Sequence, residues 1–323
     1  MTKFPDKPLL SGPKRQHYLP RSYIEGFARE GRVSVFDRDK NEFRNQKPDQ
    51  VCVIGHFYTF NDLEGRKRFE LEHLFHVYET KGADAIRKLV TKDELTVDER
   101  TDFAIYLAFA VSRTPEHMES IKHLNSGFIK DICKRLFSDI DQVKEQMRSK
   151  PDAPATEAEL EAEAKAMVDF AQSDLYEVKT NHQWVVGLAL QMAFDIAPIL
   201  AGRNWMVLHR GSDKRSFITS DAPVLLTTMG PRETGFWWSG VGFGCSDALV
   251  LFPLNASCLL AVYGDGGGLR HSTVGDDYMR RFNLELARRC HRFIIGRDEE
   301  LLRSLAKRLN LSETKWEPKF RKF

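Results

Sequence analysis

The sequence predicts an α+β fold, with a mixed or antiparallel sheet and a large helical insertion. Three observations support this prediction: strand patterns near the N-terminus, helical periodicity through the middle, and a strand-rich final third. Strands, then helices, then strands are typical of an α+β arrangement. We expect one domain over residues 1–323, with a motif segment over 11–60, a helical block over 67–201, a strand-rich part over 203–297, and a helix with a basic tail over 298–323.

The first strands are predicted from alternation of apolar and polar side chains. Residues 32–36 alternate, a polar turn follows, and residues 42–44 continue the pattern, which is typical of a β-hairpin. Residues 56–60 are predicted to form a further short strand.

The helical block shows apolar residues at helical spacing over 67–90. Thr96 and Glu99 have the spacing of a capping box, which predicts the start of the next helix. Pro115 suits the first turn of a long helix predicted over 116–148. Residues 149–155 are typical of a linker, a helix is expected over 156–176, and residues 182–200 predict a buried helix because they are apolar on most faces.

The final third alternates short apolar runs with turn residues. It predicts strands over 204–209, 216–219, 224–227, 248–252, 257–263 and 291–295, and helices over 276–290 and 298–309.

Composition excludes few function classes. The net charge is +2, so overall charge argues neither for nor against nucleic acid. From residue 280 to the end, however, thirteen Lys/Arg stand against six Asp/Glu, which predicts either a phosphate contact or a solvated terminus. None of the five cysteines has Cys-x-x-Cys spacing, and no apolar run of 18 residues occurs. We expect a cytoplasmic protein without a signal peptide or membrane span.

The segment 16–27 is the richest in chemically useful side chains. His17 lies beside Gln16, Tyr18 and Arg21, and an imidazole can act as a general acid or base near neutral pH. The alternative is a histidine that holds the loop in place by a hydrogen bond.

Three further places in the sequence carry candidate residues. Ser220 and Asp221 stand at the end of a predicted strand, where Asp221 could hold a metal or instead form an Asx turn before Pro223. Arg113 ends a predicted helix, where it could hold a phosphate or satisfy helix-terminal carbonyls. Glu79 is the better inward carboxylate of its helix, since the Glu-x-x-His pattern at Glu70 occurs in only one clear copy.

The opening motif QHYLPR and the later motif FITSDAP together resemble the bacterial family called domain of unknown function 4238 (DUF4238). The similarity runs from about residue 14 to residue 297. It implies a bacterial or phage-borne cytoplasmic protein, and some members of that family are associated with anti-phage defence islands. No catalytic mechanism comes with the family.

Residue chemistry and resemblance together suggest an anti-phage effector that acts as a nuclease or other phosphoester hydrolase. In this hypothesis the motif residues converge on nucleic acid in one pocket. His17 moves a proton, and Arg21 and Arg113 hold phosphate. Asp221 takes part in catalysis and, with Glu79, holds a divalent ion such as magnesium. The substrate-binding residues are Gln16, Tyr18, Arg113 and Ser220.

The alternative hypothesis is a non-enzymatic sensor or binding module that recognises a phage component or a nucleotide-like ligand. The aromatic residues between glycines over 235–240 favour it, because such residues suit a binding loop. A third interpretation gives the motifs a purely structural role.

Overall fold

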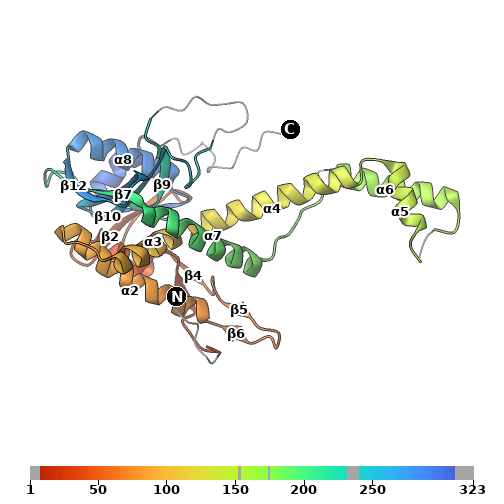
Figure 1. Ribbon diagram of the computed structural model, residues 1–323, viewed down its shortest axis with the longest axis horizontal. Coiled ribbons are helices and arrows are strands. Elements are labelled where there is room, and N and C mark those ends of the chain that lie inside the picture. The colour runs from red at the N-terminus through yellow and green to blue at the C-terminus, as the bar shows by residue number, and fades with distance from the viewer. Residues whose placement is uncertain (1–7, 152–153, 174, 231–239, 310–323) are drawn as a thin grey trace. The chain divides into compact units, whose positions relative to one another are not determined.

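The computed structural model describes residues 8–151, 154–173, 175–230 and 240–309 (Figure 1). The chain divides into two compact units, one made of Met1–His117 with Val186–Phe323 and the other of Met118–Val185. The sheets are mostly antiparallel and lie beside many helices, which confirms the predicted α+β class. The predicted single domain over residues 1–323 stays a prediction.

The larger sheet of the first unit has five strands in the order β12-β7-β11-β10-β9. Neighbouring strands are antiparallel except β12 and β7, which are parallel, so the sheet is mixed. The strands are β7 (Arg203–Arg210), β9 (Leu225–Thr228), β10 (Ala248–Asn255), β11 (Cys258–Asp265) and β12 (Leu269–Val274).

Helices cover both faces of this sheet. On one face, Leu208 and Leu259 belong to a buried cluster with Phe282 of α8 (Asp276–Arg289) and Leu302 of α9 (Glu299–Ala306). On the other face, Trp205 meets Phe103 of α3 (Val97–Ser112) edge to face at 5.5 Å. The sheet is therefore buried between helical layers.

The second sheet joins the two ends of the chain. Its order is β3-β2-β13-β8, and every neighbouring pair is antiparallel. The strands are β2 (Val33–Asp37), β3 (Glu42–Gln46), β8 (Thr219–Ser220) and β13 (Phe293–Gly296). The predicted hairpin over 32–44 is confirmed, and strands from far along the chain complete it.

The N-terminal region also contains two short antiparallel sheets of two strands each. β1 (Arg15–His17) pairs with β4 (Val53–Gly55), and β5 (Phe60–Asn61) pairs with β6 (Lys67–Arg68). The predicted strand over 56–60 is wrong for most of its length. His56 has a φ of 54° and its carbonyl accepts from the Thr59 amide at 3.3 Å, so the chain turns there.

Two helices pack against each other beside the sheets, α2 (Glu70–Thr91) and α3. The predicted capping box at the start of α3 is confirmed. The Glu99 amide donates to Thr96 Oγ1 at 3.2 Å, and the Thr96 amide donates to Glu99 Oε2 at 2.9 Å.

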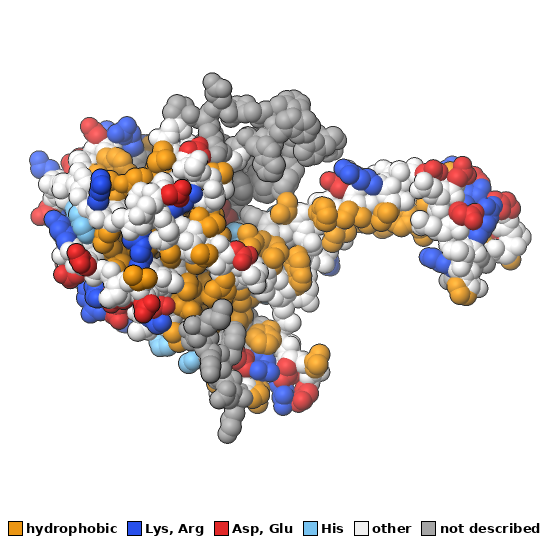
Figure 2. Space-filling view, viewed as in Figure 1, with side chains coloured by type: hydrophobic (Ala, Val, Ile, Leu, Met, Phe, Trp, Pro, Cys, Tyr) orange, Lys and Arg blue, Asp and Glu red, His pale blue; other side chains and the backbone are white. Residues whose placement is uncertain are grey.

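The second unit is helical. It contains most of α4 (Pro115–Leu136), with α5 (Ile140–Arg148) and α6 (Glu157–Gln172). The predicted single helix over 116–148 is wrong, because Asp139 caps a new helix by accepting the Asp141 amide at 2.9 Å. Hydrophobic side chains lie exposed along α4, where Figure 2 shows an orange stripe; they are Leu124, Phe128, Ile132 and Leu136.

The helix α7 (His182–Gly202) differs from its prediction. Ala193 and Leu200 are buried as expected, but Trp184 and Phe194 are 49% and 41% exposed, so one face meets solvent. Among the described residues it alone is long and apolar enough to cross a membrane, by length and composition. Core helices of soluble proteins share these properties, and the expected absence of a membrane span stays a prediction.

Candidate functional site

The opening motif occupies β1 and the short helix α1 (Arg21–Glu25). Gln16 is buried, and its side-chain amide is engaged on both sides. Nε2 donates to Thr59 Oγ1 at 3.0 Å, and Oε1 accepts from the Tyr58 amide at 2.7 Å. Gln16 therefore holds the turn at 56–59 against β1, and its predicted role in substrate binding stays a prediction.

His17, Glu72, Glu79 and Arg113 form a group that we call the polar cluster. Arg113 is buried at the end of α3 and binds Glu79 of α2 through Nη1 at 2.7 Å. Its Nε donates to the Tyr18 carbonyl at 2.9 Å, which places Arg113 beside the strand that carries His17. Charge interactions couple His17 and Glu72 to both Glu79 and Arg113.

Burial shifts the two titratable groups of the polar cluster in opposite directions. It lowers the pKa of His17 below its ordinary 6.5, although the Asp49 backbone and the Glu79 charge oppose this. It raises the pKa of Glu72 to about 7, and the nearby Glu79 carboxylate adds to this rise while Arg113 opposes it. At neutral pH the imidazole is therefore mainly neutral, while Glu72 can bind its proton near neutral pH. The two shifts reverse the usual order of these pKa values, so that a neutral imidazole and a protonated carboxyl group can coexist near pH 7, as acid–base chemistry requires.

Three atoms of the polar cluster are buried and lack a hydrogen-bond partner among the described residues: His17 Nε2, Glu72 Oε1 and Arg113 Nη2. A buried polar atom left unpaired costs about 1–3 kcal/mol. Such atoms are uncommon in folded proteins and are candidates for a functional role. Together they offer a proton acceptor, a carboxyl group and a guanidinium N–H to a ligand.

Asp221 lies in a different buried group. Its Oδ1 accepts from the His291 amide at 3.0 Å, and its Oδ2 accepts from the Arg292 amide at 2.7 Å. Burial raises the pKa of Asp221 to about 7, against the effect of these amides. The Asx turn considered from the sequence is wrong, because the side chain binds backbone about 70 residues further along the chain.

The neighbours of Asp221 are also buried. Tyr18 and Cys52 share a side-chain hydrogen bond. The pKa of the Cys52 thiol is raised mainly by burial and, to a smaller extent, by the charge of Asp221. Ser220 donates to the Ala222 carbonyl at 2.8 Å and so fixes the local turn. These contacts fix the FITSDAP segment to the core of the first unit.

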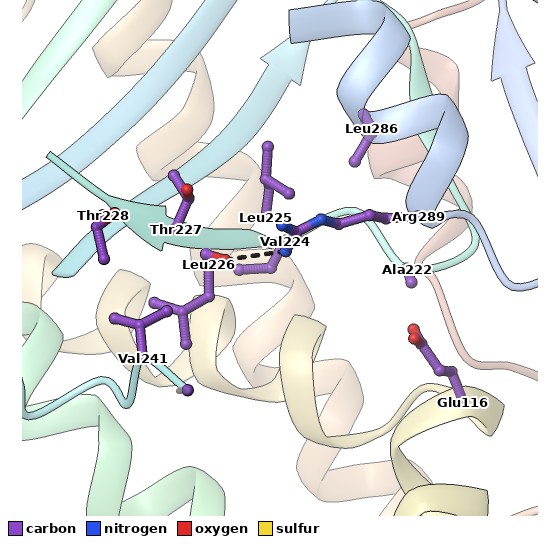
Figure 3. Close-up of a pocket in the computed structure, with 11 residues that line it drawn as sticks. Glu116, Ala222, Val224, Leu225, Leu226, Thr227, Thr228, Val241, Leu286 and Arg289 are labelled. Atoms are coloured by element: carbon purple, nitrogen blue, oxygen red, sulfur yellow. Dashed lines mark hydrogen bonds between the residues drawn. The ribbon is translucent and has the colours of Figure 1, made fainter. Parts of the chain in front are cut away.

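A cavity of about 620 Å³ opens beside this segment. Figure 3 shows its apolar wall, which β9 and α8 supply through residues such as Leu225 and Leu286. Glu116 and Arg289 add charged groups, and Arg289 Nη1 donates to the Leu226 carbonyl at 3.1 Å. Burial raises the pKa of Glu116 to about 7, with Arg289 opposing. An apolar hollow with few charged groups is the usual form of a small-molecule site.

One protein-family model matches this chain over residues 15–300, under the description "Protein of unknown function (DUF4238)". The chain belongs to the DUF4238 family. No curated protein and no solved structure matched it.

The DUF4238 chain brings only some of its predicted site residues together. His17, Glu79 and Arg113 share the polar cluster. Tyr18, Ser220 and Asp221 belong to the other buried group.

Arg21 lies apart from both groups, on the surface of α1. Its side chain is 65% exposed and binds Glu25 at 2.7 Å. The predicted convergence of these residues in one pocket is therefore not what the described residues show.

The described part of this DUF4238 protein contains no group of three or more His, Cys, Asp or Glu side chains arranged to hold a metal ion. The two predicted ligands also have other partners: Glu79 binds Arg113, and both oxygens of Asp221 bind main-chain amides. The donor set does not fit a resident divalent ion, so we derive no metal-dependent step.

Sequence reasoning missed Glu72, Glu116 and Arg289. Glu72 had a usable signal, because it stands seven residues before Glu79 and so shares its helix face. Glu116 and Arg289 lie far apart in sequence and meet only around the cavity. Most of the aromatic loop over 235–240 and the basic tail over 315–323 fall outside the described residues.

Proposed function

We propose that this DUF4238 protein is a phosphoester hydrolase that acts on nucleic acid through its polar cluster. The observation that carries the proposal is the presence of three unpartnered buried atoms on one coupled group, His17 Nε2, Glu72 Oε1 and Arg113 Nη2. Imidazole, carboxyl and guanidinium can supply the proton acceptor, the proton donor and the phosphate-binding group of a metal-independent phosphodiester cleavage.

In the proposed reaction, neutral His17 accepts a proton from water as the water oxygen attacks phosphorus. The bond from phosphorus to the leaving oxygen breaks, and protonated Glu72 donates its proton to that oxygen. Arg113 stabilises a non-bridging phosphoryl oxygen through Nη2, while Glu79 keeps the guanidinium in position through Nη1. His17 then releases its proton to solvent and Glu72 takes a proton up from solvent, which restores both groups for the next turnover.

The test uses labelled RNA, single-stranded DNA and double-stranded DNA, each with magnesium and with a chelator. Wild type is compared with His17→Ala, Glu72→Gln and a control, His76→Ala, which lies exposed on the same helix as Glu72. We expect cleavage by wild type and the control, and a loss of about 100-fold or more in the two cluster variants. Absence of cleavage by folded wild type on every substrate would contradict the proposal.

A second candidate function is ligand sensing, and the cavity between β9 and α8 favours it. An apolar wall with Arg289 beside it suits a nucleotide-like ligand, with its base on the wall and its phosphate on the guanidinium. Titration calorimetry with nucleotides would compare wild type, Arg289→Gln and the neighbouring Arg288→Gln. Saturable binding lost only in Arg289→Gln supports sensing, and equal heats in all three argue against it.

The role in anti-phage defence is proposed on the family resemblance. Expression in a bacterial host followed by phage challenge tests it. If cells that express wild type give fewer plaques than cells that express His17→Ala, both the defence role and the catalytic role of the polar cluster are supported. If cells that express wild type give as many plaques as cells with the empty vector, the defence role is contradicted.

A further inference from the structure

Three arginines from separate elements line one small cavity on the first unit. Arg215 precedes β8, Arg280 belongs to α8, and Arg308 follows α9. The cavity has a volume of about 100 Å³, and its other lining residues are Asn283, Leu301, Ser304 and Leu305. This site lies outside the polar cluster and shares no residue with the cavity of Glu116 and Arg289.

The charges around this cavity are poorly balanced. Arg215 approaches Asp276 at 3.6 Å, whereas Arg280 and Arg308 form no ion pair with a carboxylate of the described residues. The three guanidinium groups that line this hollow form a local excess of positive charge, which a bound anion would balance. Ser304 also lines the cavity and is exposed, so its hydroxyl can donate to a ligand there.

The floor of the cavity is fixed by packing. Leu305 is buried in the core cluster. Asn283 uses both ends of its amide, accepting the Ile218 amide at 3.1 Å and donating to the Ser216 carbonyl at 2.9 Å. Asn283 therefore ties α8 to the segment that carries Arg215, and the Arg308 amide donates to the Leu305 carbonyl at 2.8 Å, which holds the turn after α9.

We infer that this cavity, the arginine pocket, binds a phosphate group. A carboxylate brings one charge and two oxygens, whereas a phosphate monoester brings about −1.5 to −2 charges and three acceptor oxygens, which suits three guanidiniums. The volume of about 100 Å³ admits a phosphate but not a whole drug-sized ligand, since the pockets that hold such ligands measure about 300–1,000 Å³. The surplus of Lys/Arg after residue 280, seen in the sequence, agrees with this assignment.

The phosphate has two possible sources, the end of a nucleic acid strand or an internal backbone position. Fluorescence anisotropy with 5′-phosphorylated and 5′-hydroxyl oligonucleotides separates them, with inorganic phosphate as competitor. The matched variants are Arg280→Gln, Arg308→Gln and Arg281→Gln, the last an exposed neighbour on α8 that does not line the pocket. All measurements are repeated in the His17→Ala background, in which the polar cluster is inactivated. Binding to the arginine pocket is then measured independently of whether wild type cleaves the oligonucleotide.

We expect Arg280→Gln and Arg308→Gln each to weaken binding by about 10- to 100-fold, while Arg281→Gln changes it by less than about threefold. A preference for the 5′-phosphate, with competition by inorganic phosphate, identifies a terminal phosphate. Equal binding of both oligonucleotides, with the same arginine dependence, identifies a backbone phosphate. Equal loss in all three variants, or no binding by wild type, overturns the inference.

Discussion

The Nε atom of Arg113 donates to the Tyr18 carbonyl oxygen at 2.9 Å, across 95 positions of sequence. The same residue accepts the Tyr58 hydroxyl through its own carbonyl at 2.7 Å and binds Glu79 through Nη1. The end of α3 therefore holds β1, the turn after β4 and α2 together. The residue that positions His17 is also a structural centre of the first unit.

Replacing Arg113 should be costly for stability. Arg113→Ala leaves the Glu79 carboxylate without its partner and removes two buried contacts, so we expect a loss of about 3–5 kcal/mol in the free energy of unfolding. Exposed Arg21→Ala should change it by less than about 0.5 kcal/mol. Urea denaturation followed by tryptophan fluorescence measures both, and similar midpoints for the two variants would contradict this account.

Asp221→Asn should destabilise the fold before it affects any chemistry. An amide side chain offers one acceptor oxygen where the carboxylate serves two main-chain amides, so either the His291 or the Arg292 N–H loses its partner. The expected cost is about 1–3 kcal/mol. Thermal unfolding tests this expectation. An unchanged melting temperature would contradict a structural role for Asp221 and would favour a catalytic one.

The stability of wild type should depend on pH through Glu72. Its pKa is about 7 in the folded chain against an ordinary value of 4.5, so between these values the native state binds more protons than the unfolded state. The free energy of unfolding of wild type should therefore fall, relative to Glu72→Gln, as pH rises from about 4.5 to 7. Denaturation at pH 5, 6, 7 and 8 gives the difference, and a constant difference would show that Glu72 titrates normally.

Two glycines in long helices should respond oppositely to alanine. A Cβ on Gly82 of α2 would collide with the Tyr106 ring of α3, whereas one on Gly187 of α7 meets nothing within 4 Å. Gly82→Ala should cost about 1–3 kcal/mol by overpacking, and Gly187→Ala should stabilise by about 0.5–1 kcal/mol. Calorimetry of both variants checks the close approach of α2 and α3, which equal melting temperatures would contradict.

Local patterns predicted local structure well. Three features depend on residues a few positions apart, and each lies close to its predicted place: the Thr96 capping box, the hairpin of β2 and β3, and the helix α8. The parallel edge strand β12 was missed because its sequence, LRHSTV, is mostly polar and its partner lies more than 60 residues earlier. Asp139 was not recognised as a cap inside an otherwise helical pattern.

The candidate site was only partly predictable, for a similar reason. Residue type alone indicated His17, Glu79 and Arg113, because imidazole, carboxylate and guanidinium in motif segments suggest chemistry. The role of Asp221 depends on the amides of His291 and Arg292, and no pattern around Asp221 indicates them. The elevated pKa of Glu72 and of Glu116 comes mainly from burial, which only the folded chain creates.

The order of strands β3-β2-β13-β8 has a consequence for synthesis on the ribosome. The hairpin of β2 and β3 emerges early, but its neighbour β13 ends at Gly296 of a 323-residue chain. Most of the polypeptide must therefore leave the exit tunnel before this sheet can assemble. Until then the edge of β2 that pairs with β13 has no partner strand, and an unpaired strand edge can bind a strand of another chain.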